Sequence, residues 1–240
     1  MTSKSLSDTI LGHLQGVRQE RALREAEPEL GHRAQQIREY QAERLRSTHA
    51  DLLGQEQTRP AALFFLDQLY GTQDFVERDA QFARIVPAIV RLFSAEVGTT
   101  VAHLAELHAL SERLDSAMAR ALPDSSLASR EAYETAWRVV GLREQRERQL
   151  DLVEIIGRAL QHYTQHPSLG RALTLMRFPA RAAGLHALQQ FLETGFDTFA
   201  RLPSPAAFMQ TIVTRERSEM HRLFGDDADG PWAAAAQLAT

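Results

Sequence analysis

The spacing of apolar residues constrains this fold most strongly, because it follows a helical period and shows no alternation typical of β-strands. Near the C-terminus, for example, apolar residues recur every three or four positions, at Leu185, Leu188, Leu192, Phe196 and Phe199. The strong helix formers Ala, Leu, Arg, Gln and Glu dominate the sequence. Asn, which favours tight hairpins, does not occur. The sequence therefore predicts an all-α protein.

Composition and charge limit the classes of function. Hydrophobic residues make up 44% and charged residues 24% of the 240 positions, a balance typical of a globular protein. The formal net charge is -4, so no general positive field favours nucleic acid, and we expect no nucleic-acid partner. The absence of cysteine excludes disulfides, thiolate zinc sites and cysteine nucleophiles. No apolar run approaches the roughly 20 residues of a membrane span, so we expect a cytoplasmic protein without such a span.

Three regions can be distinguished along the chain. Residues 1–55 are polar with thin apolar stripes, which predicts amphipathic helices that either lie across the body or form an arm for a partner. Residues 56–225 read as a helical bundle domain, and residues 226–240 as a mobile tail of low complexity. The turn signals predict an irregular bundle of about seven to nine helices. Residues 127–165 form either one long helix or two helices with a bend near Gly141.

Three ionisable residues fall on helix faces that the apolar period assigns to the core. Asp79 lies one turn after Phe75, Arg146 lies on the stripe of the long segment, and Glu216 lies between apolar residues near the C-terminus. An unpaired buried charge is costly, so we expect Arg146 to pair with Asp79 or Glu216. The planar guanidinium of arginine suits this role. Such a network either fixes helix register or, with Tyr70, lines an open polar pocket for a ligand.

The segment LMRFPARAAG contains a second candidate site. Pro179 fits the first position of a helix, and Phe178 before it offers no side-chain acceptor to the free amides there. Arg177 and Arg181 flank these amides, which predicts binding of a phosphate or carboxylate. The alternative is that both arginines bind acids or terminal carbonyls of neighbouring helices.

Metal and catalytic motifs are weak in this sequence. A helical di-iron centre needs two inward Glu-x-x-His motifs, whereas Glu29 and His32, which form such a motif, lie in the polar N-terminal region. His103 and Glu106 share a helical face but have no evident partner set. There is no Gly-x-Ser-x-Gly elbow, P-loop or dinucleotide fingerprint. The sequence thus nominates no metal ligand, no cofactor and no catalytic residue, and an enzyme is the less favoured interpretation.

Three blocks of the sequence resemble a known family. They are FFLDQLYGTQDFVERDAQFARIVP, RVVGLREQRERQLDLVEIIGRALQ and LMRFPARAAGLHALQQFLETGFDTF, and the resemblance extends from about residue 60 to residue 224. With their FFL-x-x-LYG-x-x-DF-x-x-RD and MR-x-PA patterns, they are similar to an uncharacterised family of bacterial cytosolic all-helical proteins. The resemblance implies a shared helical fold and transfers no activity, cofactor or catalytic residue.

Two classes of function remain open from the sequence. The first, which we favour because catalytic signatures are missing, is a noncatalytic cytoplasmic interaction or regulatory protein with a protein partner or self-association. The second is a helical bundle, or an enzyme, that binds a small anionic or acyl ligand. Its pocket would lie around Tyr70, Asp79 and Arg146, or at Arg177 and Arg181.

Overall fold

The structure is a computed structural model that describes residues 3–69, 76–122 and 130–226. Over these residues the protein is all-α, as the sequence predicts, and contains no strand. The described helices are α1 (Ser3–Ala26), α2 (Pro28–Thr48), α3 (Ala50–Gly54), α4 (Arg59–Leu69), α5 (Val76–Leu92), α6 (Ala95–Ala121), α7 (Arg130–Val140), α8 (Arg143–Thr164), α9 (Pro167–Ala182), α10 (His186–Ala200) and α11 (Pro205–Phe224). Two expectations fall largely outside this part of the chain: the role of Tyr70, and the tail from residue 227 onward.

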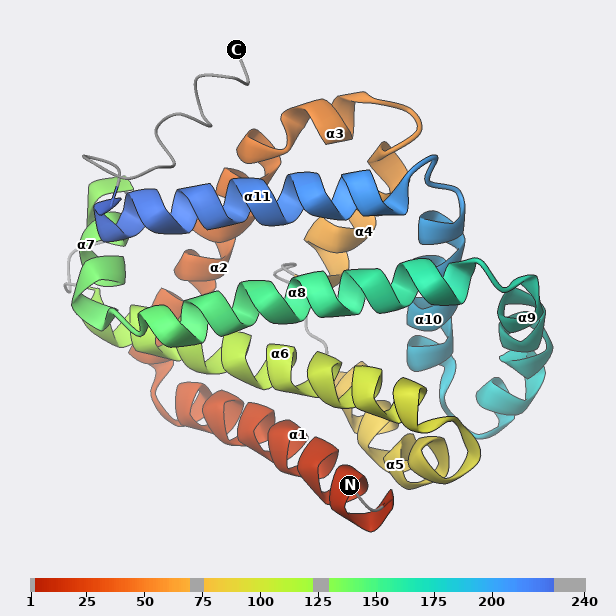
Figure 1. The fold of residues 1–240 in the computed structure, drawn as a ribbon. Helices are drawn as coiled ribbons and strands as arrows, with labels where there is room; N and C mark the ends of the chain where they lie inside the picture. The colour runs from red at the N-terminus through yellow and green to blue at the C-terminus, as the bar shows by residue number, and fades with distance from the viewer. Residues whose placement is uncertain (1–2, 70–75, 123–129, 227–240) are drawn as a thin grey trace.

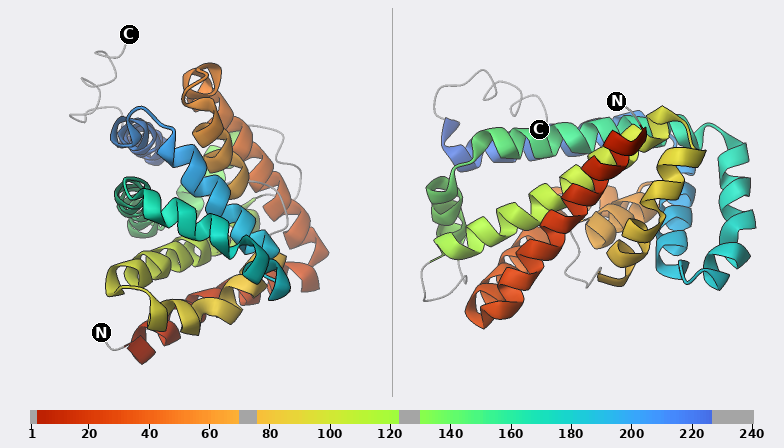
Figure 2. Two further views of the ribbon diagram at one scale, coloured as in Figure 1. Left: turned by 90° about the vertical axis from the view of Figure 1, so that its right-hand side faces the viewer. Right: turned by 90° about the horizontal axis from the view of Figure 1, so that it is seen from below.

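Three long helices form the central layer of the molecule. Helix α8 packs against α6 on one side and against α11 on the other (Figure 1). Helices α1 and α2 both pack on α6, so the polar N-terminal region lies against the body in this structure. At one end of the layer α10 packs on α4, α5 and α8, and α9 stands outside α10, at the edge of the molecule in two views (Figures 1 and 2). Helix α7 closes the opposite end against α6 and α11.

The described helices number eleven, so the expected count of seven to nine is wrong. Part of the difference is the short helix α3, which the apolar period does not separate from its neighbours. Another part lies at Gly141 and Leu142, whose φ angles of 62° and 52° are left-handed. Residues in this conformation interrupt a right-handed helix, so the segment 127–165 contains two helices rather than one.

Two hydroxyl caps define the beginnings of α6 and α11. The side chain of Ser94 accepts a hydrogen bond from the amide of Val97, and Ser204 accepts one from Ala207. Each cap satisfies an amide that has no partner within its own helix. These caps therefore fix where the two helices begin.

The apolar core lies where α4, α6, α8, α10 and α11 meet. Leu114, Leu152 and Phe65 are almost completely buried there. The approach of α8 to α11 is close because Gly157 has no side chain: a Cβ at this position would lie 2.6 Å from the Met209 methyl group. A second cluster surrounds Tyr133 between α2, α6, α7, α8 and α11.

Candidate functional site

A cavity of about 420 Å³ runs through the interior of the helical body. Its lining includes Asp79 from α5, Arg146 from α8 and Glu216 from α11. The structure therefore brings three of the four residues nominated for a polar pocket to one cavity. The fourth, Tyr70, lies outside the described residues.

One end of the cavity is apolar and reaches the surface. Its walls come from α5, the first half of α6, α9 and α10, and include Phe82, Ile85, Ile89, Val97, Val101, Leu104, Leu173, Leu185, Leu188 and Phe191. Three further lining residues are strongly exposed: Phe93 (55%), Met176 (51%) and Leu192 (40%). Since these residues touch both solvent and the cavity, the mouth lies between α5, α9 and α10.

Asp79 lies at the centre of a charged cluster deeper in the cavity. Its Oδ2 atom is 2.8 Å from Nε2 of His108 and 2.9 Å from Nη2 of Arg21, and its Oδ1 atom is 3.6 Å from Nε of Arg78. Burial by itself would raise the pKa of Asp79, but His108 and the two arginines hold it below its usual value. The carboxylate is thus ionised and fully engaged by residues of α1, α5 and α6.

Glu112 extends this cluster along α6. Arg21 and Arg24 of α1 both bind its carboxylate, and Arg24 also donates to the hydroxyl of Ser116 at 2.8 Å. Burial acts to raise the pKa of Glu112, but these two arginines keep it lowered. The polar helix α1 is therefore attached to α6 through buried ion pairs as well as through apolar contacts.

The sequence analysis did not identify Arg21, Arg24 or Glu112. A signal was present in α6, which has a second buried face formed by small residues, opposite its leucine stripe. This face consists of Gly98, Ala102, Ala105, Ser116 and Ala119. Small side chains allow close helix packing, and Glu112 lies on the same face. A buried small-residue face that contains an acid predicts a cationic helix packed against it.

Glu216 is bound by residues of α2 and the turn that follows it. Arg44 donates two hydrogen bonds to its carboxylate, at 2.6 and 3.2 Å, and Nε2 of His49 is 3.0 Å from Oε1. Glu216 is only 8% exposed, as its inward position in the sequence predicts. Burial by itself would raise its pKa, but Arg44 and His49 hold the pKa below the usual value.

Arg146 is buried, as predicted, but its expected partners, Asp79 and Glu216, form ion pairs with other residues. The carboxylates of Asp79 and Glu216 are engaged by arginines and histidines of α1, α2, α5 and α6 and of the α2–α3 junction. The guanidinium carbon of Arg146 instead lies 3.9 Å from the ring centre of Trp137 on α7. A guanidinium stacked on an indole face is stabilised by the quadrupole of the ring. The helical period placed Arg146 in the interior correctly but did not specify the helix that it meets.

The cavity ends among nitrogen donors of α2 and α7. Arg38, Arg44 and Trp137 all line it. The Nε–H group of each arginine and the indole N–H of Trp137 are buried and have no hydrogen-bond acceptor among the described residues. A buried N–H group without an acceptor is costly, so such groups normally have a partner. Three of them at one end of a cavity form a place for a ligand that carries acceptor atoms.

The predicted anion site at Pro179 is not formed as expected, because no helix begins there. Pro179 lies inside α9, which starts twelve residues earlier at Pro167 and continues to Ala182. A proline inside a helix removes one backbone hydrogen bond and crowds the carbonyl four residues earlier, so the local sequence favoured a helix start at this position. The amides near Arg177 and Arg181 therefore lie within the last turns of a helix. Arg177 binds Glu193 of α10 at 2.7 Å, which is the structural contact expected as the alternative for this residue, whereas Arg181 is exposed and forms no ion pair with the described residues.

The described residues contain no group of three or more histidine or acidic side chains that could hold a metal ion. Within the same ranges no helix is long and apolar enough to cross a membrane. Together the fold and the site define a class of all-α protein with an internal cavity, apolar at its mouth and charged at its inner end, where arginines and acids both line it. The chain belongs to the family described as Domain of unknown function (DUF8198), whose model matches residues 20–230.

This match covers more of the chain than the blocks quoted from the sequence. It begins within α1 and so includes most of the N-terminal helices that those blocks omit. No curated protein and no solved structure matches the chain.

Proposed function

We propose that this protein binds an amphipathic molecule with an apolar chain and an anionic head group. The observation that carries the proposal is the continuity of the cavity, which joins an apolar mouth between α5, α9 and α10 to buried nitrogen donors of α2 and α7. The proposal takes up the anionic or acyl ligand expected as the second alternative from the sequence.

The apolar part of the cavity suits a hydrocarbon chain. The whole cavity has a volume of about 420 Å³, which lies within the range of known small-molecule sites, roughly 300–1,000 Å³. Its walls there are aliphatic and aromatic side chains such as Val101, Leu188 and Phe191. Each methylene group moved from water into such surroundings contributes about 0.8 kcal/mol. Affinity should therefore increase with chain length until the cavity is filled.

The inner end suits a carboxylate or phosphate. The acids that line it already have cationic partners, as Glu216 has with Arg44. The donors without acceptors, from Arg38, Arg44 and Trp137, need an acceptor. Charge-assisted hydrogen bonds from guanidinium to a carboxylate or phosphate are short and strong. A head group with negative oxygens would satisfy donors that the described residues leave without acceptors.

A chain-length series tests the proposal. Delipidated protein would be mixed with saturated carboxylates of increasing length, and with the alcohols of matching length, and the melting temperature recorded. A ligand that binds only the folded state raises the melting temperature. We expect the rise to grow with chain length and to be larger for each carboxylate than for its alcohol. If no carboxylate and no alcohol of any length raises the melting temperature, the proposal is overturned.

Variants assign the two ends of the ligand. Val101→Phe should fill the apolar part and reduce the shift for the longest chains first. Trp137→Phe removes one buried N–H but keeps an aromatic ring, so it should reduce the difference between carboxylate and alcohol. Arg143→Met is a control outside the cavity. Arg143 stacks on Phe224 and binds Asp226, and the cavity lining does not include it, so this variant should leave the ligand-induced shifts unchanged.

The sequence also favoured a noncatalytic interaction or regulatory role in the cytoplasm. Such a role is compatible with ligand binding and stays an expectation. Self-association belongs to the same expectation, and the oligomeric state measured in the experiment below bears on it.

A further inference from the structure

Helix α9 exposes two large apolar side chains to solvent. Leu175 is 78% and Phe178 is 82% exposed, more than any other large hydrophobic residue that the structure describes. In a helix, positions 171, 175, 178 and 182 follow one another on a single face. Arg171 and Ala182 therefore lie on the same outward face as Leu175 and Phe178, and Arg181 lies at its edge.

The opposite face of α9 belongs to the cavity. Leu173, Met176 and Ala180 line the cavity from this helix. Packing against α10, and to a smaller extent α8, holds α9 at the edge of the molecule (Figure 2). The helix thus has an inner face that contributes to the mouth and an outer face that nothing in the described structure covers. The exposure of Leu175 and Phe178 is therefore a property of a fixed helix face.

The charge on α9 is of one sign. Its sixteen residues include three arginines and no acidic residue. Arg177 binds Glu193 at 2.7 and 2.9 Å, so part of this charge is neutralised by α10. Arg171 and Arg181 are exposed, and within the described ranges neither forms an ion pair. Two cations therefore accompany the two apolar side chains on the outward side.

We propose that this outward face, defined by Arg171, Leu175, Phe178 and Arg181, docks on the anionic surface of a lipid bilayer. A bilayer surface offers phosphate groups and an apolar layer within a few ångströms of each other, which is what a basic amphipathic helix requires when it lies in the interface. A sixteen-residue helix is about 24 Å long and can lie flat on such a surface. The mouth of the cavity then lies next to the lipid.

This inference does not depend on the proposed function, because it concerns the outer face and not the contents of the cavity. Docking is measured without any added chain-length ligand. If docking fails, the melting-temperature series is unaffected. If that series fails, the vesicle result still stands. The two proposals can thus be rejected separately.

Vesicle flotation tests the inference on the full chain. Wild-type protein would be mixed with vesicles of phosphatidylcholine alone, and with vesicles in which about one third of the lipid is phosphatidylglycerol. We expect flotation with the anionic vesicles, loss of flotation as salt is added, and little binding to phosphatidylcholine alone. Absence of binding to the anionic vesicles at low salt would overturn the inference.

Two double variants separate the apolar and the electrostatic contribution. Leu175→Ser with Phe178→Ser removes the apolar contact and should abolish flotation. Arg171→Gln with Arg181→Gln should weaken binding about 25-fold, because each basic residue near an anionic surface contributes roughly a factor of five. Since all four side chains are exposed, we expect both double variants to keep the wild-type melting temperature.

The controls are also exposed but lie elsewhere on the surface. Val139→Ser on α7 removes an apolar side chain that is 69% exposed, and Arg158→Gln on α8 removes an arginine whose side chain is 68% exposed. Both should float as wild type does, and equal loss in the controls would contradict the inference. Light scattering is the second readout. A wild-type dimer that becomes a monomer in the Leu175→Ser, Phe178→Ser variant and does not bind vesicles would instead assign this face to a second copy of the chain.

Discussion

Arg44 of α2 and Glu216 of α11 lie 172 positions apart in the sequence and are joined by two partly buried hydrogen bonds of 2.6 and 3.2 Å. His49 adds a third contact to the same carboxylate. Helix α2 thereby holds the last helix of the body through charge as well as through apolar packing. Because Glu216 is nearly inaccessible to water, the stability of the folded protein depends on these partners of its carboxylate.

Arg44→Met should therefore be strongly destabilising. The change leaves the Glu216 carboxylate buried with one partner fewer, and such a loss typically costs about 3–5 kcal/mol. Urea unfolding followed by circular dichroism measures it. The double variant Arg44→Met, Glu216→Met should lose less than Arg44→Met alone, since it removes the stranded charge together with its partner.

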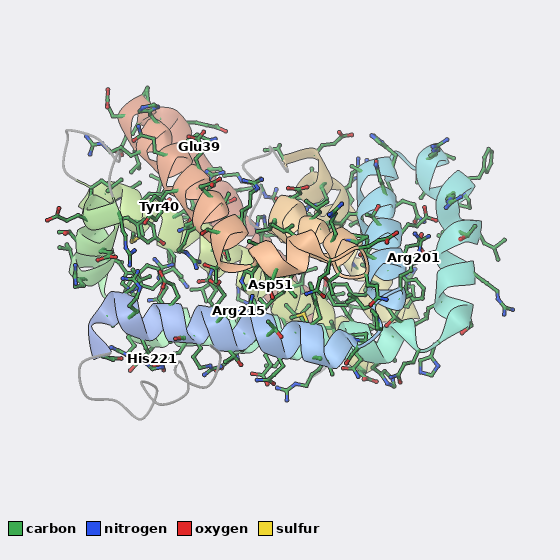
Figure 3. The ribbon with its side chains drawn as sticks, turned by 90° about the horizontal axis from the view of Figure 1, so that it is seen from above. Glu39, Tyr40, Asp51, Arg201, Arg215 and His221 are labelled. Atoms are coloured by element: carbon green, nitrogen blue, oxygen red, sulfur yellow. The ribbon has the colours of Figure 1, made fainter. Side chains whose placement is uncertain are left out.

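A surface pair on the same helix supplies the control for this prediction. Arg215 of α11 and Asp51 of α3 are linked at 2.6 Å and point toward each other at the surface (Figure 3). Their side chains are 35% and 48% exposed, so water stabilises either charge when the other is removed. Arg215→Met should cost less than about 1 kcal/mol. Equal losses at Arg44 and Arg215 would contradict a special role for the buried pair.

The helical period placed three of the inward-facing charged residues correctly. Arg146 and Glu216 are 4% and 8% exposed, and the side chain of Asp79 is 13% exposed. The period did not predict their partners, because it describes one helix at a time and the contacts join different helices. The structure places Arg44 against Glu216 and Arg21 against Asp79, choices that depend on the packing of α1 and α2.

Helix boundaries show a similar limit. Pro179 reads as the start of a helix from its local sequence, whereas it lies within the last turns of α9. A proline inside a helix removes one backbone hydrogen bond, so a short segment read by itself favours the first helical position for it. The sequence nominated Asp79, Arg146 and Glu216 for a pocket, but it did not predict the extent of the cavity or its apolar part. The lining comes from residues between 14 and 223 that meet only after folding.

Gly157 allows α8 and α11 to approach each other, which leads to a second prediction. A Cβ at this position would lie 2.6, 2.8 and 3.0 Å from the Cε, Cγ and Sδ atoms of Met209. Gly157→Ala should therefore destabilise the protein by about 1–3 kcal/mol, because the whole Met209 side chain must move in a packed core. Thermal unfolding measures the change.

Gly16→Ala is the matched control for this prediction. Gly16 also lies inside a helix, α1, but no atom lies within 4 Å of a Cβ built on it. Alanine is favoured over glycine in a helix by up to about 1 kcal/mol, so this variant should be more stable than wild type. A stabilising effect of both substitutions would show that Met209 adjusts readily and that the close approach of α8 and α11 is not set by Gly157.

Asp115 on α6 differs from the other acids of the cavity in the strength of its partners. Nε of Arg38 is 3.7 Å from its Oδ2 atom, and Nε2 of Gln41 donates to Oδ1 over 3.4 Å. These contacts are longer than those of Glu216. Burial consequently raises the pKa of Asp115 from 3.8 to about 6, and Arg38 opposes this rise only in part.

The raised pKa of Asp115 predicts how stability depends on pH. Between pH 4 and pH 6 the folded protein holds this proton more tightly than the unfolded chain does, so stability falls as the pH rises through this window. A difference of two pKa units corresponds to about 3 kcal/mol. Asparagine has no carboxyl proton to lose, so the stability of Asp115→Asn lacks this pH dependence. The unfolding free energy of the variant minus that of wild type should therefore increase from pH 4 to pH 6 and then remain constant. Urea titrations at several pH values measure this difference, and a constant difference across the whole range would show that Asp115 ionises near its ordinary pKa.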